Sequence, residues 1–574
     1  MKKLFLIFIS LIGINAFSQI GVNVFDPNPT VFDNPITNEN ELITMLGKAQ
    51  DLLTSYSWAI MVAEIASDNA RKGGDSELDF IALKTIEDFQ HTSANLVTQD
   101  IWNFLFAGYN RASFAYEKGR IIPNISPNYL AEALFLKAFY SYNLIEWFGH
   151  HPQIMEYDDD NNPFLSNSSI YERENLLYGI LSFLDEGISI TTNHGVSSSG
   201  RTVIDKNTML AFKAKTYMKL EQYYEVNSVT NQIINSGQYS LESNYQNIFN
   251  YRTSSSIFDI DCTDNLTATW DCLLCSQGNV MSGFIGIRIY EGPEFKSGYG
   301  FNIPTQESYN SFDSGDIRRE ISILDISDWS LQNPTVFFIE GYNHSGYFNK
   351  KYLPRQGGME LPFVELTYGN DLKFIRYAEI LLLCSESSLR IGNNNEAAVY
   401  LNQVRNRAGL SSISSIDINM DHIIEERRSE FMGEGKRLFD LIHFEIASEI
   451  LPNYDNGKNE VFPIPQSFID LANTNEDIIT QNPGYATTSL SVNDINKSTF
   501  IVFPNPASNF LNVSLSQTFN SPKLELYDVQ GRKVFSALLK QSDLLDVSNL
   551  KSGIYLYILK DGKEFKFTGK IIKQ

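Results

Sequence analysis

The chain has 574 residues, of which 43% are hydrophobic, and a formal net charge of −23. This length exceeds one compact core and predicts two or more domains. The negative charge repels nucleic acid and anionic lipid, and no basic stripe interleaved with aromatic residues offsets it. Nucleic-acid binding is therefore not expected. No internal apolar run is long enough to span a bilayer.

Residues 1–18 have the features of a signal peptide. Two lysines follow the first residue, an apolar run covers 4–14, and Ala16-Phe17-Ser18 offers small residues at a cleavage site. This order of charge, apolar run and small residues predicts an exported protein that begins at Gln19 after processing. The first cysteine is Cys262, so an N-terminal lipid anchor is not expected.

Helices are the main predicted element of the first 485 residues. Apolar residues recur at three- and four-residue steps, as one buried helical face requires. Gly409 follows one such run and is a good left-handed C-cap. The predicted helices lie at 41–68, 102–112, 129–148, 211–217, 226–234, 373–386, 399–408 and 423–432.

Helical hairpins recur near Tyr129, Met209, Asp371 and Asp421 at unequal intervals, with the layout of tetratricopeptide units. A uniform solenoid would need a constant period. The fold class is therefore predicted as mainly α, with tetratricopeptide-like hairpins separated by long irregular insertions.

The main insertion, residues 241–369, has little helical periodicity and is rich in Gly, Asn, Ser and aromatic residues. An insertion of this length in a compact protein is usually functional. We therefore expect ligand contacts to come from this segment.

The periodicity changes to two after a polar linker at 486–498. Residues 510–515, 523–527 and 553–559 alternate as half-buried strands, with turns at 528–532 and 560–563. These strands predict a small antiparallel β-sandwich over 499–574.

Several motifs resemble the SusD/RagB family, the outer-membrane nutrient-binding proteins of Bacteroidetes. In chain order they lie at Trp102–Ala112, Ala131–Phe139, Trp147–Pro152, Tyr377–Glu386, Leu401–Gly409, Glu426–Leu441, Val461–Pro465 and Gln481–Tyr485. The resemblance covers about 41–485 and implies one nutrient-binding domain at 19–485. It also implies a partner, a SusC-like TonB-dependent transporter, which the SusD-like protein covers as a lid. Family members are usually lipoproteins, so the missing N-terminal cysteine departs from the pattern.

Three motifs near the end of the chain resemble the sorting domain of the type IX secretion system. They are Phe503-Pro504-Asn505-Pro506-Ala507, Tyr527-Asp528 with Gly531, and Leu550-x-x-Gly553-Ile554-Tyr555. This resemblance implies export by the type IX machinery, and then attachment to the outer membrane surface or release. The alternative interpretation is an immunoglobulin-like binding module.

No catalytic motif is present: the chain lacks His-Glu-x-x-His, Gly-x-Ser-x-Gly, Gly-x-Gly-x-x-Gly and a Walker loop. Glutamates 379, 386, 426, 430 and 434 interleave with arginines on predicted helices, which favours ion pairs between helices over acid–base catalysis. No enzyme activity, metal or cofactor is expected. Cys262, Cys272 and Cys275 could form a loop disulfide, and Cys384 is predicted to be a buried thiol.

Sugar sites combine aromatic platforms with polar donors and acceptors. The candidate ligand-binding residues, chosen for their polar, loop-like sequence settings, are Trp58, Asp68, Asn69, Trp270, Tyr290, Trp329 and Tyr342. The predicted function is capture of an oligosaccharide or another nutrient without catalysis, for uptake through the transporter. Two alternatives remain: a tetratricopeptide-type surface protein that binds protein or peptide, and a secreted glycoside hydrolase.

Overall fold

The structure, a computed structural model, forms two units, Met1–Thr487 and Thr488–Gln574, which are described separately. The expected signal peptide and the expected linker lie outside the described residues. The described residues are 26, 29–32, 35–157, 161, 163–191, 197–198, 202–263, 277–357, 366–473, 478–485, 500–503, 510–515, 521–528, 532–540, 542–551, 553–561 and 564–573.

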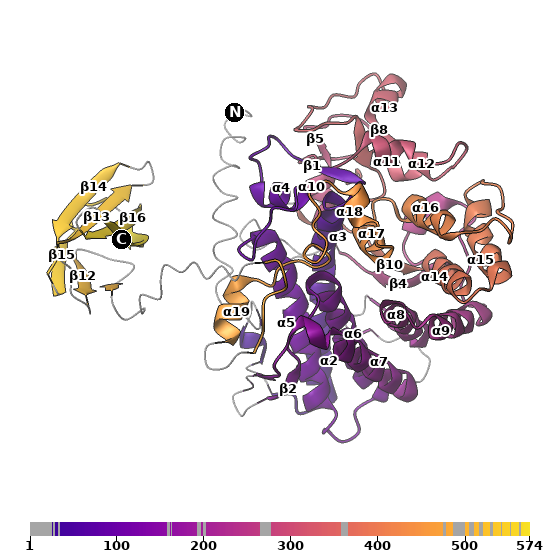
Figure 1. Cartoon of the computed structure of the whole chain (residues 1–574), viewed down its shortest axis with the longest axis horizontal. Coiled ribbons are helices and arrows are strands. Elements are labelled where there is room, and N and C mark those ends of the chain that lie inside the picture. Colours follow the sequence, from indigo (N-terminus) through magenta and orange to yellow (C-terminus); the bar gives the residue numbers. More distant parts are fainter. Residues whose placement is uncertain are drawn as a thin grey trace. The chain divides into compact units, whose positions relative to one another are not determined.

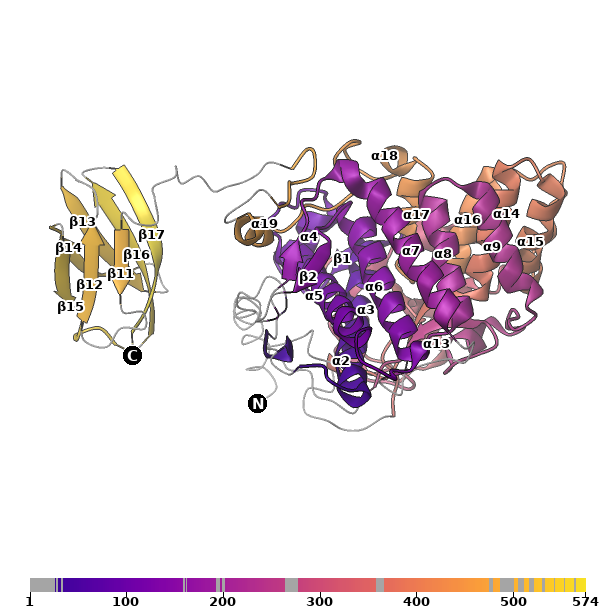
Figure 2. The ribbon, with the colours of Figure 1, turned by 90° about the horizontal axis from the view of Figure 1, so that it is seen from below.

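A row of helices forms the main body of the first unit, each packed against the next (Figures 1 and 2). The stacking supplies the core that no single hairpin could bury alone, as expected for tetratricopeptide-like pairs. In order, the row is α2 (Glu39–Asp51), α5 (Leu96–Gly119), α6 (Pro127–Phe148), α7 (Arg173–Ile190), α8 (Lys206–Lys219), α9 (Tyr223–Asn235), α14 (Tyr377–Arg390) and α15 (Asn394–Arg407). Of these, α7 was not predicted from the sequence.

The predicted helix at 41–68 is divided in two. A 3-10 turn, η2 (Leu52–Ser55), separates α2 from α3 (Tyr56–Ile65). The two parts differ in environment: α2 buries one side, whereas all ten residues of α3 are buried. The chain therefore turns here from the edge of the helical row into the centre of the unit.

The α14–α15 hairpin begins later than predicted. Residues 372–376 form strand β10 (Leu372–Arg376), which pairs antiparallel with β4 (Ser256–Ile260). The backbone of this stretch is therefore extended, and the helix starts at Tyr377. Gly409 has φ +85° directly after α15 and its cap residue, which confirms the left-handed C-cap.

The described residues between β4 and β10 form only short elements, as the lack of helical periodicity predicted. They are α10 (Met281–Ile285), β5 (Ile287–Arg288), β6 (Ser297–Gly298), β7 (Phe301–Pro304), α11 (Gln306–Asn310), α12 (Arg319–Ser322), β8 (Ile323–Asp325), α13 (Ile326–Gln332) and β9 (Tyr347–Asn349). Strand β7 pairs with β1 (Ala70–Gly73), so the insertion is joined to the N-terminal part of the chain.

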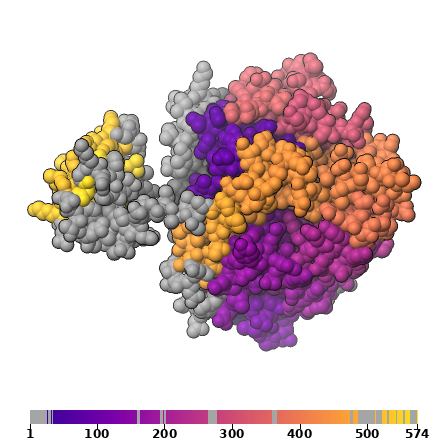
Figure 3. All heavy atoms as spheres, in the orientation of Figure 1, coloured from indigo at the N-terminus to yellow at the C-terminus, as the bar shows by residue number. Residues whose placement is uncertain are grey.

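The end of the first unit runs across its surface. Residues 437–473 form an orange band in Figure 3, beside the magenta segment that contains α7 to α9. The remaining short elements are η1 (Pro29–Phe32), α4 (Ile81–Glu87), β2 (Ile154–Tyr157), β3 (Pro163–Leu165), η3 (Ile170–Glu172), η4 (Tyr245–Phe249), α16 (Met420–Phe431), α17 (Arg437–His443), α18 (Ala447–Ile450) and α19 (Gln466–Ala472).

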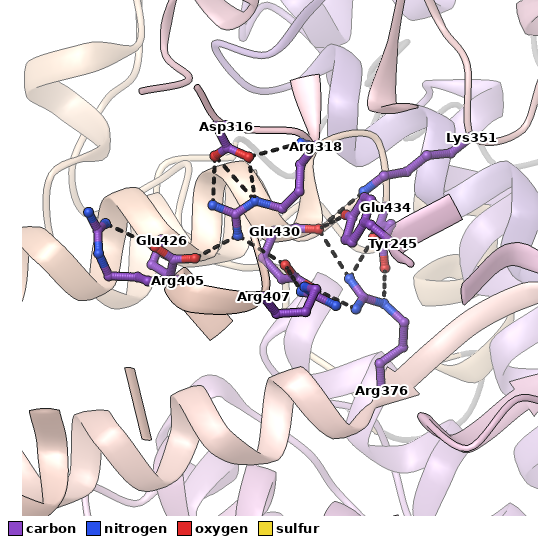
Figure 4. A network of polar contacts seen from close by, with 10 residues as sticks. All are labelled: Tyr245, Asp316, Arg318, Lys351, Arg376, Arg405, Arg407, Glu426, Glu430 and Glu434. Carbon is purple, nitrogen blue, oxygen red and sulfur yellow. Dashed lines mark hydrogen bonds and ion pairs between the residues drawn. The ribbon is translucent and has the colours of Figure 1, made fainter. Parts of the chain in front are cut away.

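A buried ion-pair network joins the insertion to the helical row, and its centre is Glu430 of α16 (Figure 4). The Glu430 carboxylate accepts from Arg376 at 2.7 Å, Arg407 at 2.5 Å and Arg318 at 3.0 Å. Burial opposes ionisation of Glu430, but these three guanidinium groups hold its pKa below the usual range. The Glu430 carboxylate is therefore ionised, and three arginines bind it.

Neighbouring carboxylates extend the network in both directions. Glu434 binds Arg376 at 2.8 Å and Lys351 at 2.7 Å, and Glu426 binds Arg318 at 2.6 Å and Arg405 at 3.1 Å. Burying charges is costly unless each is paired and hydrogen-bonded. The prediction that these glutamates form ion pairs between elements is confirmed.

The two remaining glutamates that the sequence predicted to form ion pairs, Glu379 and Glu386, are also paired. Glu379 binds both Lys215 at 2.8 Å and Lys436 at 2.7 Å, which connects α8 to the residue before α17. Glu386 accepts from His443 at 2.7 Å. All five glutamates thus serve as structural anchors.

The second unit is the predicted antiparallel β-sandwich. One sheet has the order β11-β12-β15 and the other β14-β13-β16-β17. Their shared core includes Leu511, Val513, Leu524, Leu526 and Leu559. The strands are β11 (Phe500–Phe503), β12 (Phe510–Leu515), β13 (Pro522–Asp528), β14 (Lys533–Leu538), β15 (Ser542–Asp546), β16 (Gly553–Asp561) and β17 (Glu564–Lys573).

Two further sequence expectations concern membranes and cysteines. Among the helices that the structure describes, none has the length and apolar character needed to cross a bilayer. Cys384 is a buried, unbonded thiol, as predicted, and burial raises its pKa to about 12. Cys272 and Cys275 lie outside the described residues.

Substituting Glu430→Gln is expected to lower the free energy of unfolding by about 3–5 kcal/mol, because it leaves buried guanidinium groups without their counter-charge. Thermal and urea unfolding followed by the helical circular-dichroism signal would measure this. Glu425→Gln is the matched control, since Glu425 is an exposed residue of the same helix. Equal stability of the two variants would contradict the anchoring role.

Asp100 of α5 is expected to make stability depend on pH. Burial raises its pKa from 3.8 to about 8. Between these two pH values the unfolded chain therefore binds fewer protons than the folded chain. Stability therefore falls as the pH rises from about 4 to 8 because of this group. Asp100→Asn should raise the melting temperature by about 2 °C or more at alkaline pH and change little near pH 4. The exposed Asp421→Asn serves as control, and a pH-independent difference between the variants would refute the assignment.

Candidate functional site

Two loops from distant parts of the sequence meet beside β1. They are residues 74–81, directly after β1, and residues 329–344, from α13 onward; we call them the two-loop surface. The Tyr342 backbone N–H donates to the Gly74 carbonyl at 2.9 Å. A Cβ on Gly341 would lie 2.4 Å from the same oxygen. The loops therefore touch so closely that only glycine fits at this position.

Lys72 binds the first loop from its buried side. Lys72 is completely buried, and its ammonium donates to the carbonyl oxygens of Ser76, at 2.8 Å, and Asp79. The same ammonium lies 5.3 Å from the centre of the Tyr342 ring, a cation–π distance. Burial lowers the Lys72 pKa, with nearby carboxylates opposing the shift. This cation thus stabilises the loop and does not face solvent.

Arg288 holds the second loop against the first. Its guanidinium binds Asp75 at 2.5 Å and donates to the Gly74 carbonyl at 3.1 Å. Its own carbonyl accepts from the Ile339 N–H at 3.0 Å. One residue of β5 therefore contacts both loops, which fixes their relative positions.

Large apolar side chains are exposed on both loops. Phe337 is 52% exposed, although its backbone is fixed by two hydrogen bonds of 2.8 Å with Glu291. The other exposed members are Leu78, Ile81, Leu331 and Ile339, at 78%, 50%, 80% and 41%. Apolar groups held in solvent on a braced backbone are typical of binding surfaces.

Trp58 does not lie in a polar loop, so that expectation is wrong. It lies in α3, is 2% exposed and packs 5.0 Å from Phe284 and 5.6 Å from Phe80, measured between ring centres. A side chain this buried does not reach a ligand at the surface. Because Phe80 belongs to the first loop, Trp58 instead supports the two-loop surface from inside.

Asp68 and Asn69 are occupied by contacts within the protein. Asp68 binds Arg437 and Arg428, each at 2.8 Å, and the pKa of its carboxyl is lowered because these cations outweigh its burial. Asn69 is 1% exposed and donates to Glu64 at 3.1 Å. Both residues tie the end of α3 to α16 and α17.

Of the four candidates from the insertion, the structure places three in or beside the second loop. The Trp329 indole donates to the Tyr290 hydroxyl at 3.0 Å, and both rings are largely covered. Tyr342 is partly exposed beside Lys72. Trp270 lies outside the described residues.

Sequence reasoning missed Phe337, Ile339 and Leu78. Residues 336–339 read Val-Phe-Phe-Ile, a short apolar run that by pattern alone resembles a buried strand. The structure buries only part of this run, since Phe337 and Ile339 are exposed. Phe338, next to Phe337, is partly buried against the core. The available signal in the sequence was the pair of adjacent aromatic residues. Neighbours on an extended segment face opposite sides, so one of the two can be expected to point outward.

Family models match both units of the chain. Residues 327–461 match the SusD family, and residues 501–574 match the secretion system C-terminal sorting domain. The chain thus contains a match to the SusD family and a match to the C-terminal sorting domain, which confirms both resemblances found in the sequence.

Among curated proteins, the chain is similar to SusD-like protein P2 of Formosa agariphila. The two are 25% identical over 444 residues, which cover 70% of this chain and 83% of the relative. Among solved structures, it is similar to a laminarin binding SusD-like protein, with 25% identity and a TM-score of 0.70 over 78% of this chain and all of that one. Surface glycan-binding protein A from Bacteroides fluxus has the same identity and coverage and a TM-score of 0.67.

Proposed function

We propose that the protein binds a glycan at the two-loop surface, on the outside of the cell, and does not cleave it. The observation that carries this proposal is the exposed Phe337 ring on a backbone fixed by Glu291. Sugar rings present flat C–H faces that pack on such aromatic and aliphatic side chains, and no folding of the loop is needed on binding. The similarity to a laminarin binding protein supports a glycan as ligand.

Within this surface, Phe337 and Ile339 would pack against the sugar from the second loop, and Leu78 from the first. Tyr342 would contact the ligand at the junction of the loops, next to the Gly74 carbonyl. Trp329 and Tyr290, which are hydrogen-bonded to each other, would support the site from behind. This division of roles keeps three of the residues that the sequence suggested and adds three that it did not.

The ion-paired glutamates of the first unit do not support glycoside hydrolysis. A glycosidase needs two carboxyl groups free to act across a cleft, one of them with a raised pKa. Glu379 and Glu430 instead have pKa values held below the usual range by bound cations, and both are buried. They are structural anchors and poorly suited to proton transfer.

The two family domains support a place at the cell surface or outer membrane. We propose that the type IX secretion machinery exports the protein by its sorting domain, and that a SusC-like TonB-dependent transporter is its partner. Affinity purification of the tagged protein from outer membranes would test this. Stoichiometric recovery of such a transporter is expected. Recovery of the protein alone, from membranes or from the medium, would overturn the transporter role.

Phe337→Ala should weaken glycan binding about tenfold, because removal of a central aromatic contact costs on the order of 1.4 kcal/mol. Calorimetric titration of the mature chain with laminarin and other glycans would measure the affinity, and the samples would be analysed for cleavage products. Ile416→Ala is the matched control, since Ile416 is 90% exposed on a different loop.

Three outcomes would count against the proposal. Equal loss of affinity in the Phe337→Ala and Ile416→Ala variants would refute the location of the site. Shortened glycans would refute the non-catalytic role. No binding to any glycan would refute the ligand class.

A further inference from the structure

A cavity of about 10 Å³ lies inside the first unit, where the strands of the insertion meet α3 and the residues that follow α16. This volume has room for one water molecule and is too small for an organic ligand. Its wall includes Asn302 of β7, Ser322 at the end of α12 and Asn349 at the end of β9. None of the described residues that line the cavity belongs to the two-loop surface.

Three side chains on this wall each have a buried polar atom that the protein leaves unpaired. These atoms are the Asn302 amide nitrogen, the Ser322 hydroxyl and the Asn349 amide oxygen, and none of them has a hydrogen-bond partner among the residues that the structure describes. The three residues are 2%, 0% and 2% exposed. Buried polar groups are almost always hydrogen-bonded, because an unpaired group has lost its contacts with water without replacement. Three such atoms around one cavity therefore require a partner inside it.

Other contacts fix two of these side chains in place. The Asn349 amide nitrogen donates to the Gly433 carbonyl at 3.0 Å, so the amide oxygen is the end that remains to be bound. A Cβ on Gly433 would lie 2.6 Å from that oxygen, so only glycine lets the amide keep this position. The Ser322 N–H donates to the Arg318 carbonyl at 2.8 Å, and the Ser322 carbonyl accepts from the Lys350 N–H at 2.9 Å. Only the hydroxyl of Ser322 therefore remains to be satisfied.

The backbone of Asn302 is unusual for a residue in a strand. Its φ angle is +54°, in the left-handed region that asparagine enters more easily than most other residues. Residues held in this region concentrate at positions where the surrounding structure uses the side chain. At Asn302 the side chain faces the cavity, which agrees with a ligand there.

The types of the three polar atoms identify the ligand. Asn349 offers an acceptor, Asn302 offers a donor, and the Ser322 hydroxyl can act as either. Water both donates and accepts, so it satisfies all three atoms at once. A metal cation cannot accept a hydrogen bond from the Asn302 amide. The carboxylate on this wall, Glu64, already accepts an N–H on each of its two oxygens.

We propose that a single internal water molecule occupies this cavity and joins three elements of the insertion. It accepts from the Asn302 amide and donates to the Asn349 amide oxygen, and the Ser322 hydroxyl binds it from a third side. Strand β7 pairs with β1, β9 pairs with β8, and α12 directly precedes β8. The water therefore connects the β1–β7 pair to the β8–β9 pair and is a permanent part of the fold.

A high-resolution crystal structure of the mature chain, from crystals soaked in rubidium chloride, tests this proposal directly. A density peak is expected at about 2.7–3.2 Å from each of the three polar atoms, without an anomalous signal from rubidium. The absence of a peak, or side chains that pair directly with one another, would overturn the proposal. An anomalous peak would identify a cation in place of the water and would overturn it as well.

Ser322→Val should expel the water, because a methyl group takes its place, whereas Ser322→Ala leaves the space and two of the three partners. Oxygen-17 relaxation dispersion, which reports long-lived internal waters in solution, should therefore detect about one fewer in Ser322→Val than in the unmodified chain, and no change in Ser322→Ala. Ser327→Val is the matched control, since Ser327 is exposed and lies outside the cavity. Equal numbers of long-lived waters in Ser322→Val and Ser327→Val would overturn the proposal. The crystallographic test needs no variant, so it stands if Ser322→Val does not fold.

Discussion

Most of the architecture of the first unit depends on Glu430. A single carboxylate on α16 receives arginines from β10, from α15 and from the segment before α12. These elements are far apart in the sequence, and they meet inside the protein where water is excluded. A buried charge tolerates only arrangements in which each partner is present. The network therefore specifies the arrangement of hairpin, strand and insertion more narrowly than apolar packing alone would.

The rigid backbone of the two loops also determines which side chains the two-loop surface exposes. Its loops carry exposed apolar groups, which would normally collapse onto the protein. Lys72, Arg288 and the close contact at Gly341 keep the loop backbones in place, so the side chains remain available. Trp58, which the sequence suggested as a ligand contact, instead packs on Phe80 and supports this surface from inside. Binding groups and supporting groups thus separate into an outer and an inner layer.

The sequence was informative wherever a local pattern had one physical meaning. Helical periodicity located α6, α8 and α14, and strict alternation located β12, β13 and β16, because each pattern follows from burying one face. The ion pairs of Glu426, Glu430 and Glu434 were foreseeable because charged residues on buried helices must be paired. Strand β10 was missed because its pairing with β4, across more than a hundred residues, leaves no local signal. The exposure of Phe337 was missed although adjacent aromatic residues on an extended segment face opposite sides, because only tertiary contacts decide which of the two is covered.

The pairing of β4 with β10 brings together the two chain ends from which the insertion leaves and to which it returns. The whole segment from 261 to 371 is therefore a closed loop on a fixed base. The segment carries the second loop of the two-loop surface, and it is tied to the rest of the unit by the pairing of β7 with β1 and by two basic residues. These residues, Arg318 and Lys351, neutralise Glu426, Glu430 and Glu434. A change of recognition within the segment must therefore leave these two basic positions in place, because they connect it to the scaffold.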